Sequence, residues 1–379
     1  MNRRDFLAAA AAAPAFSNLQ TDFGFTSLFD GKSLDGWKIA RGPESAFYVD
    51  DGCIVGSPSA EFPAWLRTER QYENFDFRCE FFVRGWTSGG IYIHAPEHGR
   101  TMWVGKQVKI FHQQDDTPMT NSMGSIFPVI APRQVEVRSQ GEWNQMRILA
   151  DWPSLRVWVN ETIVQDLNME THPQLKYRLR SGFIGLSTLN YPLRFRNLRI
   201  QELPRKEEWE VLYQNTSDME KWFISESSEH APAQFDALGS VIRADGSGHL
   251  ATKEKYRDFQ LHLYIRGDRH HNGGVLVRSA GEGLKGPSHY EIQLHDVEEA
   301  HYPTGSLYHF KRAIYPRIET GKWSLMQLLF RGNECVIRVN GETVLEYEGL
   351  ENQNEGHIEL QAHRPGKWIE FKDIQVKRL

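Results

Sequence analysis

The stretch SHYEIQLHDVEE at residues 288–299 places polar side chains at every second position of an extended segment. In a strand, Ile292 and Leu294 would point to one side, and Glu291, Gln293 and His295 to the other. Carboxylates and imidazoles often transfer protons, and such a row on the open face of a curved sheet can line a ligand-binding groove. The alternative is a solvated polar face in which Glu291 forms a structural ion pair with Arg278.

A two-carboxylate glycosidase is a second alternative. Acids on one sheet face can supply a general acid and a nucleophile about 5 Å apart. A regular strand, however, would place Glu291 and Asp296 on opposite faces. The segment therefore does not predict a simple carboxylate pair.

An earlier stretch, GKQVKIFHQQDD at residues 105–116, has the same period but carries Lys109 and His112. It follows HAPEHGR at 94–100, which formally fits the His-x-x-Glu-His pattern of some zinc proteases. That pattern requires a helix, and Pro96 comes directly after a predicted strand, so we do not expect proteolysis.

The two stretches together nevertheless hold a polar, titratable set: His94, Glu97, His98, Lys109 and His112. One hypothesis is a second specialised site, with His112 or Lys109 as base or hydroxyl ligand. The other is a ligand-free structural half.

Histidines are concentrated late in the chain, where eleven of the fifteen follow residue 229. Imidazole is a common metal ligand, but the spacing matches no recognised ligand motif. We therefore predict groove and surface histidines and no cofactor, with a metal ion as an open alternative.

Composition describes a folded chain of 379 residues with a net charge of −5. That length predicts two domains, and the absence of a basic excess argues against a nucleic-acid partner. The three cysteines, Cys53, Cys79 and Cys335, lie in apolar, alternating stretches, which predicts buried thiols rather than disulfides. Oligomeric state is not predictable from these features.

An internal repeat organises the chain beyond residue 27. In order, the matching pairs are YENF (72–75) with YRDF (256–259), SGGIYIH (88–94) with NGGVLVR (272–278), MGSIF (123–127) with TGSLY (304–308), GEWNQM (141–146) with GKWSLM (321–326), and VWVNETIV (157–164) with IRVNGETV (337–344). The period is domain-sized, so we predict tandem domains at 24–203 and 211–379 with a linker at 204–210.

Each repeat alternates apolar and polar residues over many short segments, as in FDFRCEFFV and FQLHLYI. This period is typical of half-buried antiparallel strands, and Asn340-Gly341 is a strong hairpin signal. We therefore predict an all-β protein with two β-sandwich domains.

The N-terminus, MNRRDFLAAAAAAPAFS, has a charged start, a short apolar run and small residues suited to cleavage. Arg3 and Arg4 before Asp5-Phe6-Leu7 are similar to a twin-arginine export motif. The run is too short to span a bilayer, so we predict a signal peptide at 1–20 and a periplasmic or secreted protein.

Several motifs together resemble the bacterial 3-keto-disaccharide hydrolase domain family, formerly a domain of unknown function. They are LFDGKSLDGWK (28–38), SGGIYI, the GSLY-type turn, GEWN and the closing strand FRNLRI. The resemblance covers both halves and implies two tandem concanavalin-like jelly rolls. It also implies exported proteins acting on carbohydrates, with members that cleave glycosides already oxidised to a ketone at carbon 3.

The second repeat matches the family's site pattern with Arg278, Glu291, Gln293, Asp296, Thr304, Gly305 and Tyr308. The first repeat departs from it, with His94, Gln107, Lys109 and His112 in place of the Arg, Glu, Gln and Asp. The second repeat is therefore the expected place for family chemistry.

The resemblance implies roles for these residues in an elimination from a 3-keto sugar. Glu291 or His295 would be the base that removes the carbon 2 proton, and Arg278 would stabilise the enolate. Gln293, Asp296 and Tyr308 would bind sugar. In the first repeat, which departs from the pattern, sugar binding by His94, Glu97, Lys109 and His112 is a separate hypothesis.

A non-catalytic carbohydrate-binding protein on the same fold is the alternative function. Aromatic residues such as Trp86, Trp103 and Trp158 would then stack on sugars.

Overall fold

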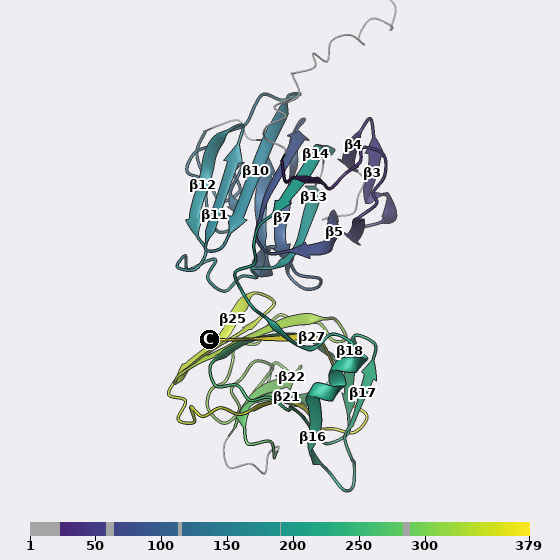
Figure 1. The fold of residues 1–379 in the computed structure, drawn as a ribbon, viewed down its shortest axis with the longest axis vertical. Coiled ribbons are helices and arrows are strands. Elements are labelled where there is room, and N and C mark those ends of the chain that lie inside the picture. Colours follow the sequence, from purple (N-terminus) through teal and green to yellow (C-terminus); the bar gives the residue numbers. More distant parts are fainter. Residues whose placement is uncertain (1–22, 58–63, 113–115, 190, 283–288) are drawn as a thin grey trace, which may run out of the picture.

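The computed structural model describes residues 23–57, 64–112, 116–189, 191–282 and 289–379 (Figure 1). The predicted signal peptide at 1–20 lies outside these ranges. Two β-sandwiches follow one another along the chain, which confirms the predicted all-β, tandem jelly-roll architecture. The last strand of the first sandwich ends at Glu202 and the first strand of the second begins at Glu210.

Two antiparallel sheets form the first sandwich. The larger has the order β12 (Thr162–Asn168), β11 (Ser154–Val159), β10 (Trp143–Asp151), β6 (Phe75–Phe82), β14 (Leu193–Glu202), β4 (Cys53–Gly56) and β3 (Phe47–Asp50), with β1 (Thr26–Ser27) also paired to β14. The smaller has the order β2 (Trp37–Arg41), β5 (Ala64–Tyr72), β13 (Gly182–Leu189), β7 (Ser88–Ala95), β8 (Lys106–Phe111) and β9 (Ile126–Phe127). Two short helices, η1 (Glu44–Ala46) and α1 (Thr101–Val104), complete it.

The second sandwich repeats this order. Its larger sheet contains β17 (Gln234–Leu238), β18 (Val241–Asp245), β27 (Ile369–Arg378), β20 (Phe259–Gly267), β23 (Ser324–Arg331), β24 (Glu334–Val339) and β25 (Glu342–Glu348), with β15 (Glu210–Tyr213) on β27. Its smaller sheet contains β16 (Trp222–Ser227), β19 (Gly248–Thr252), β26 (His357–Ala362), β21 (Asn272–Ser279) and β22 (Tyr290–His295). A short helix, η2 (Thr216–Lys221), follows β15.

Alternation along the strands builds a separate hydrophobic core in each sandwich. On β24, for example, buried Cys335, Ile337 and Val339 alternate with residues that are more exposed. The hairpin after β24 turns at Asn340 and Gly341, whose φ angles of 49° and 83° lie in the left-handed region that Asn and Gly tolerate. All three cysteines are buried and free, as predicted.

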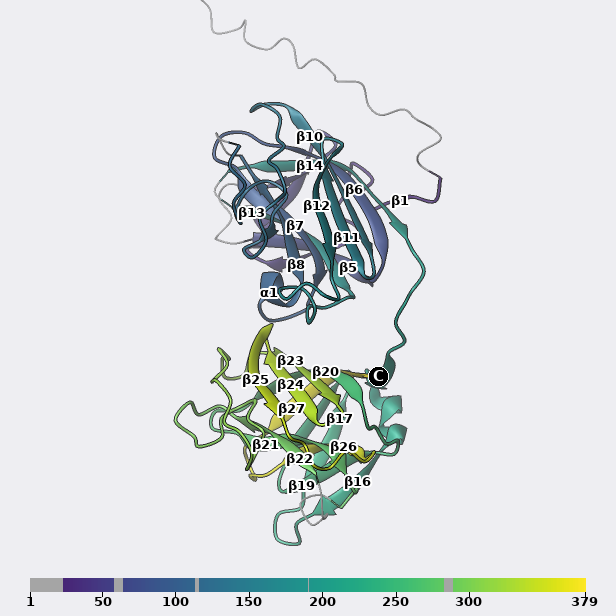
Figure 2. The same ribbon diagram turned by 90° about the vertical axis from the view of Figure 1, so that its left-hand side faces the viewer.

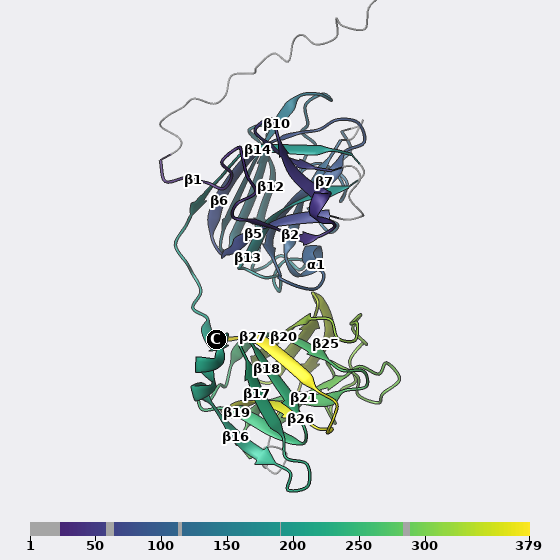
Figure 3. The same ribbon diagram turned by 90° about the vertical axis from the view of Figure 1, so that its right-hand side faces the viewer.

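The first sandwich packs against the outer face of the larger sheet of the second (Figures 2 and 3). Val104 of α1 packs with Tyr264 of β20 and Leu325 of β23 in a small hydrophobic cluster, which Leu179 and Trp323 border. The smaller sheet of the second sandwich lies on the far side from this contact (Figure 2). The outer face of that sheet therefore belongs to the second repeat alone.

Candidate functional site

Polar side chains line the outer face of the smaller sheet in the second sandwich. On β22, Tyr290, Ile292 and Leu294 belong to the core, so the side chains of Glu291 and Gln293 lie on the opposite, outer face. Both are only 5% exposed, so this is a desolvated row and not the solvated polar face considered as the alternative.

Among the polar side chains of β22, Glu291 has a carboxyl group whose pKa lies above its usual value. Burial raises the pKa of its carboxyl to about 7. A Cβ atom placed on Gly274, on the neighbouring strand β21, would lie 2.8 Å from Glu291 Oε1 and 3.2 Å from Gln361 Oε1. The Glu291 carboxylate and the Gln361 amide thus lie close together above Gly274. A carboxylate with a pKa of about 7 is well suited to act as a base at neutral pH.

The segment from Thr304 to Tyr308 borders β22 and extends the sheet. The Tyr308 N–H donates to the Glu291 carbonyl at 2.9 Å, and Leu307 pairs with Ile292. Because Leu307 and Ile292 face the core, alternation places Tyr308 on the same side as Glu291. The half-buried Tyr308 ring lies 5.1 Å from the Tyr302 ring, centroid to centroid, which gives an aromatic edge beside the carboxylate.

A second carboxylate, Glu359 of β26, lies on the same outer face and is completely buried. Ser225 Oγ donates to it at 2.7 Å, Ser279 Oγ donates to its other oxygen, and His249 Nδ1 lies 3.4 Å away. Burial raises the pKa of Glu359, but the contacts with His249 and the two serines outweigh it and hold that pKa below its usual value. The face therefore carries two carboxylates with oppositely shifted pKa values, an arrangement that separates acid and base roles.

His289 is a further member of this face. It lies two residues before Glu291, its pKa is lowered by burial, and Glu359 and His249 are among the charged groups around it. Its buried Nδ1 has no hydrogen-bond partner among the described residues. His295, on the other side of Glu291, is four residues away, roughly 13 Å along a strand. His289 is thus nearer to Glu291 than the predicted His295.

Arg278 lies apart from this cluster. Its guanidinium donates to the carbonyl oxygens of Arg257, Gly332 and Asn352 and pairs with Asp258 at 3.2 Å. The ion pair with Glu291 that was considered as the alternative is not among the contacts of the described residues. These contacts of Arg278 instead hold the neighbouring loops and strand ends in place.

Asp296 also lies away from Glu291. It accepts from Thr320 Oγ1 at 3.2 Å and lies 3.7 Å from His271 Nδ1. Alternation along β22 had placed the two acids on opposite faces, and these contacts agree with that placement.

The first sandwich presents Gln107 and Lys109 at the positions of Glu291 and Gln293. Lys109 is 7% exposed; its Nζ donates to Ser88 Oγ at 2.9 Å and lies 4.7 Å from the centre of the Phe127 ring. Burial lowers the pKa of Lys109 to about 8. Gln107 donates to Ser187 Oγ at 3.1 Å. A buried cation therefore stands where the second sandwich has an amide next to a carboxylate.

The other predicted ligands of the first repeat are dispersed. His94 is 1% exposed; its Nε2 lies 2.7 Å from the Glu73 carbonyl and its Nδ1 lies 2.9 Å from Lys106 Nζ. Burial, and then Lys106, hold the pKa of His94 well below its usual value. His112 follows the end of β8 and, by alternation, faces away from Lys109. The structure thus does not bring His94, Lys109 and His112 together.

Glu97 takes part in the contact between the sandwiches. It binds Lys372 of β27 at 2.7 Å, and its N–H donates to Tyr264 Oη at 2.9 Å. The same Lys372 ammonium donates to His98 Nε2 at 2.8 Å. The loop at 94–100 is therefore a docking element. Within the described ranges, no cluster of three or more His, Cys, Asp or Glu side chains is arranged to hold a metal ion.

The aromatic residues considered for sugar stacking are also scattered. Trp86 is 58% exposed. Trp103 borders Gly341 of the other sandwich, and Trp158 lies under Arg147 on the larger sheet. They do not form one stacking surface.

Three residues of the second face were not singled out from the sequence: Glu359, His249 and His289. A signal for two of them was present, because HIELQA (357–362) alternates Glu359 with core residues and His289 shares the parity of Glu291. The neighbourhood of His249 depends on strand order, which a single sequence does not give.

Three comparisons with known proteins bear on this site. The family of the 3-keto-alpha-glucoside-1,2-lyase-like domain matches residues 24–201 and again residues 208–377. No curated protein matches significantly.

No helix in the described part of the chain is long and apolar enough to cross a membrane.

Among solved structures, two suspected glycosyl hydrolases from Parabacteroides distasonis ATCC 8503 are similar to one half of the chain. The first is 19% identical over 50% of this chain and 99% of its own, with a TM-score of 0.44. The second is 21% identical over 47% and 99%, with a TM-score of 0.42. The carbohydrate-binding module CBM66 from Bacillus subtilis is 9% identical over 44% and 96%, with a TM-score of 0.34. These likenesses are too distant to assign a function.

Both copies of the family domain coincide with the two sandwiches, and the second copy carries the desolvated carboxylate described above. By these matches, the chain belongs to the family of the 3-keto-alpha-glucoside-1,2-lyase-like domain, a family of carbohydrate-active proteins, and contains that domain twice.

Proposed function

We propose that the second sandwich cleaves glycosides that already carry a ketone at carbon 3. One observation supports this most directly: Glu291 is buried on an outer sheet face, and its pKa is raised to about 7. A carboxylate of this kind is a stronger base than an exposed one and is still ionised in part at neutral pH. Family membership supplies the reaction class.

The reaction is an elimination. The ketone at carbon 3 acidifies the proton on carbon 2, and the Glu291 carboxylate takes this proton. The electron pair left on carbon 2 forms the carbon 1–carbon 2 double bond as the bond from carbon 1 to the glycosidic oxygen breaks. The aglycone leaves and takes up a proton, and addition of water to the double bond would complete a net hydrolysis.

Neighbouring side chains position the sugar in this proposal. The Gln361 amide beside Glu291 and the Gln293 amide on the same strand would hydrogen-bond the sugar hydroxyls. The Tyr302 and Tyr308 rings offer a half-exposed edge for stacking. Arg278 is not assigned an enolate role, because its guanidinium is committed to three carbonyl oxygens and Asp258.

For the first sandwich we propose sugar binding without cleavage. Its site strand lacks the carboxylate, and Lys109 with Ser88 offers hydroxyl ligands in its place. Replacing Lys109 by Met should then weaken the binding of sugar to the whole chain while turnover at saturating substrate stays unchanged.

The test of the main proposal is incubation of the full chain with 3-keto-glucosides and with their unoxidised parents. Release of the aglycone from the ketone alone, with transient ultraviolet absorbance of the conjugated enone, is the expected result. Release from both substrates would point to an ordinary glycosidase. Binding of either sugar without release would favour the alternative, a carbohydrate-binding protein.

We also propose export by the twin-arginine route, on the basis of Arg3 and Arg4 before Asp5-Phe6-Leu7. Replacing both arginines by lysine should retain the protein in the cytoplasm, as measured by cell fractionation. Unchanged export of this variant would rule the route out.

A further inference from the structure

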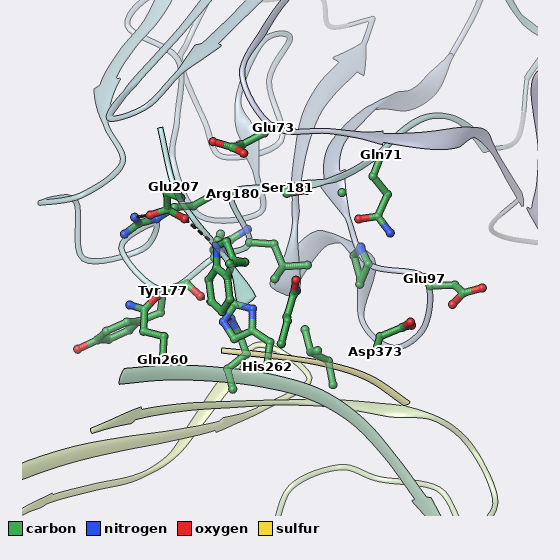
Figure 4. Close-up of a pocket in the computed structure, with 18 of the residues that line it drawn as sticks. Gln71, Glu73, Glu97, Tyr177, Arg180, Ser181, Glu207, Gln260, His262 and Asp373 are labelled. Carbon is green, nitrogen blue, oxygen red and sulfur yellow. Dashed lines mark hydrogen bonds and ion pairs between the residues drawn. The ribbon is translucent and has the colours of Figure 1, made fainter. Parts of the chain in front are cut away.

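A cavity of about 420 Å³ lies where the two sandwiches meet (Figure 4). Its floor is the outer face of the larger sheet of the second sandwich, including Gln260 and His262 of β20 and Gln327 of β23. Its upper wall is the segment 176–182 of the first sandwich, and the ring of Trp209 in the linker packs at a tilt against His262, with ring centroids 4.4 Å apart. The volume lies within the range of roughly 300–1,000 Å³ that is usual for small-molecule sites.

Cations gather at one end of this cavity. Burial lowers the pKa of His262 to about 3, and the next causes are the neighbouring charges of Lys377, Arg180 and Arg338. Arg178 is a further neighbour of Arg338. His262 is thus a neutral imidazole within a cationic environment, where it can donate or accept a hydrogen bond.

Few carboxylates compensate these charges. Glu207 pairs with both Arg180 and Lys377, the second at 2.7 Å. Arg178 donates to the carbonyl oxygens of Gln174, Met102 and Gly105.

Arg338 stands over the Tyr177 ring at 5.3 Å and donates to the Gly341 carbonyl. Its Nε is buried and has no hydrogen-bond partner among the described residues. Within the described ranges, neither Arg178 nor Arg338 pairs with a carboxylate.

The acids at the other end of the cavity are committed elsewhere. Glu97 binds Lys372 at 2.7 Å, and Glu202 binds Arg70 at 2.9 Å. Glu73 lies nearer to Arg180 and Lys377 and offsets part of their charge, and it also accepts hydrogen bonds from the Lys206 N–H and the Asn74 amide. The cationic end therefore keeps an excess of positive charge, and burying charges without counter-charges is unfavourable unless another group supplies them.

We propose that this cavity binds a sugar that carries an anionic group, such as a carboxylate or a phosphate, with the anion beside Arg338, whose buried Nε has no partner among the described residues. Arg178 is committed to carbonyl oxygens and contributes positive charge nearby. Guanidinium groups present planar donors that match carboxylate and phosphate oxygens. The amides of Gln260 and Gln327 and the rings of Trp209 and Tyr177 supply the hydroxyl ligands and flat surfaces that a sugar ring needs. The site is separate from Glu291, which lies on the opposite face of the second sandwich.

Calorimetric titration of the full chain with glucuronate, glucose 6-phosphate, inorganic phosphate and glucose tests the proposal. We expect at least one of the two anionic sugars to bind about tenfold or more tightly than glucose, and binding to weaken as the ionic strength rises. Arg338→Met should weaken this binding about tenfold or more, because it removes a charged donor. Lys176 is exposed beside Tyr177, and Lys176→Gln should weaken binding of the anionic sugar by a smaller factor. This variant provides a second test if Arg338→Met does not fold.

Arg156→Met is the matched control, since Arg156 pairs with Asp166 on the surface outside the cavity and should not affect binding. Glu291→Gln should also leave it unchanged, which separates this site from the proposed elimination site. Equal binding of inorganic phosphate and both anionic sugars would overturn the sugar assignment. Absence of anion binding, or binding indifferent to Arg338→Met and Lys176→Gln, would overturn the site.

Discussion

The smaller sheets of the two sandwiches share a backbone and differ in charge. On the second, the site strand carries the carboxylate of Glu291, and burial raises its pKa to about 7. On the first, Lys109 occupies the neighbouring position on the equivalent strand, and burial lowers its pKa to about 8. Burial thus favours the neutral form of each group, and one duplicated scaffold holds a weak acid in one copy and a weak base in the other.

His94 and Arg278 occupy equivalent positions in the two repeats and make a similar structural contact, although the residue types differ. His94 and Arg278 both adopt left-handed backbone conformations, with φ of 50° and 51°. Nε2 of His94 contacts the carbonyl of Glu73, and Nε of Arg278 donates to the carbonyl of Arg257, the matching residue of the second repeat. The replacement of Arg by His therefore preserved a structural contact, whereas the change from Glu291 to Gln107 altered the site.

The largest effect should come from Glu291→Gln. Loss of a general base lowers turnover by about a thousandfold, and the variant should still fold because Gln fills the same volume. Steady-state release of aglycone from a 3-keto-glucoside measures it. Lys109→Met is the matched change in the other sandwich and should leave turnover within about twofold. If Lys109→Met were the inactive variant, the two faces would have exchanged roles.

Arg278→Met should lower the free energy of unfolding by about 3–5 kcal/mol, because it leaves Asp258 and three carbonyl groups without their donor. His94→Leu should have a smaller effect of the same kind, about 1–3 kcal/mol. Denaturant unfolding measures both. Turnover per folded molecule should be retained in each variant; an intact fold with lost turnover in Arg278→Met would restore a catalytic role for this residue.

Stability should depend on pH in opposite ways at the two sites. The folded-state pKa of Glu291 is raised, so its penalty grows as pH rises from about 4.5 to about 7 and then stays constant at about 3 kcal/mol. The folded-state pKa of Lys109 is lowered, so a penalty of similar size, about 3 kcal/mol, is present below pH 8 and disappears as pH rises to about 10.5.

Measured against wild type, Glu291→Gln should therefore gain stability as pH rises from about 4.5 to about 7 and keep that advantage at higher pH. Lys109→Met should lose its advantage above pH 8. Urea unfolding across this pH range gives both curves, and parallel curves for the two variants would contradict the assignment. The same titration predicts that kcat/KM for a 3-keto-glucoside rises with pH up to about 7.

The smallest effect is expected from substitution of Gly274 and Gly90, which lie beside Glu291 and Gln107 on the two smaller sheets. In Gly274→Ala the new Cβ would approach Glu291 Oε1 within 2.8 Å, so the carboxylate must shift and turnover should fall about tenfold. In Gly90→Ala the new Cβ would meet the Val108 carbonyl oxygen at 2.6 Å. That change should lower stability but not turnover per folded molecule, and equal kinetic losses in the two variants would show that both faces contribute to catalysis.

Strand alternation and the repeat allowed the fold and the face of Glu291 to be predicted. They could not place Arg278, because a bulge between Leu276 and Ser279 breaks the alternation and turns this side chain toward the strand ends. A similar register shift on the first smaller sheet accompanies His94. Such bulges are local backbone choices that the period of the sequence does not reveal.

The roles of Glu97 and of the cationic cavity were also beyond the sequence. Glu97 pairs with Lys372, 275 positions away, and the cavity exists only where two folded units meet. A run such as HAPEHGR has the composition of a ligand-binding site and of a docking loop alike. The partner surface distinguishes these two functions, and it is formed by the other repeat.

The hydrophobic cluster of Val104, Tyr264 and Leu325 also limits how the two repeats can be reused. A gene fragment that encodes the second repeat alone would leave Tyr264, Leu325 and the neighbouring Trp323 facing water, which favours self-association. Exchange of single repeats between related genes would meet the same obstacle unless the docking loop moved with them. The two repeats should therefore be more stable together than apart, although the outer face of the smaller sheet in the second sandwich takes no part in this contact.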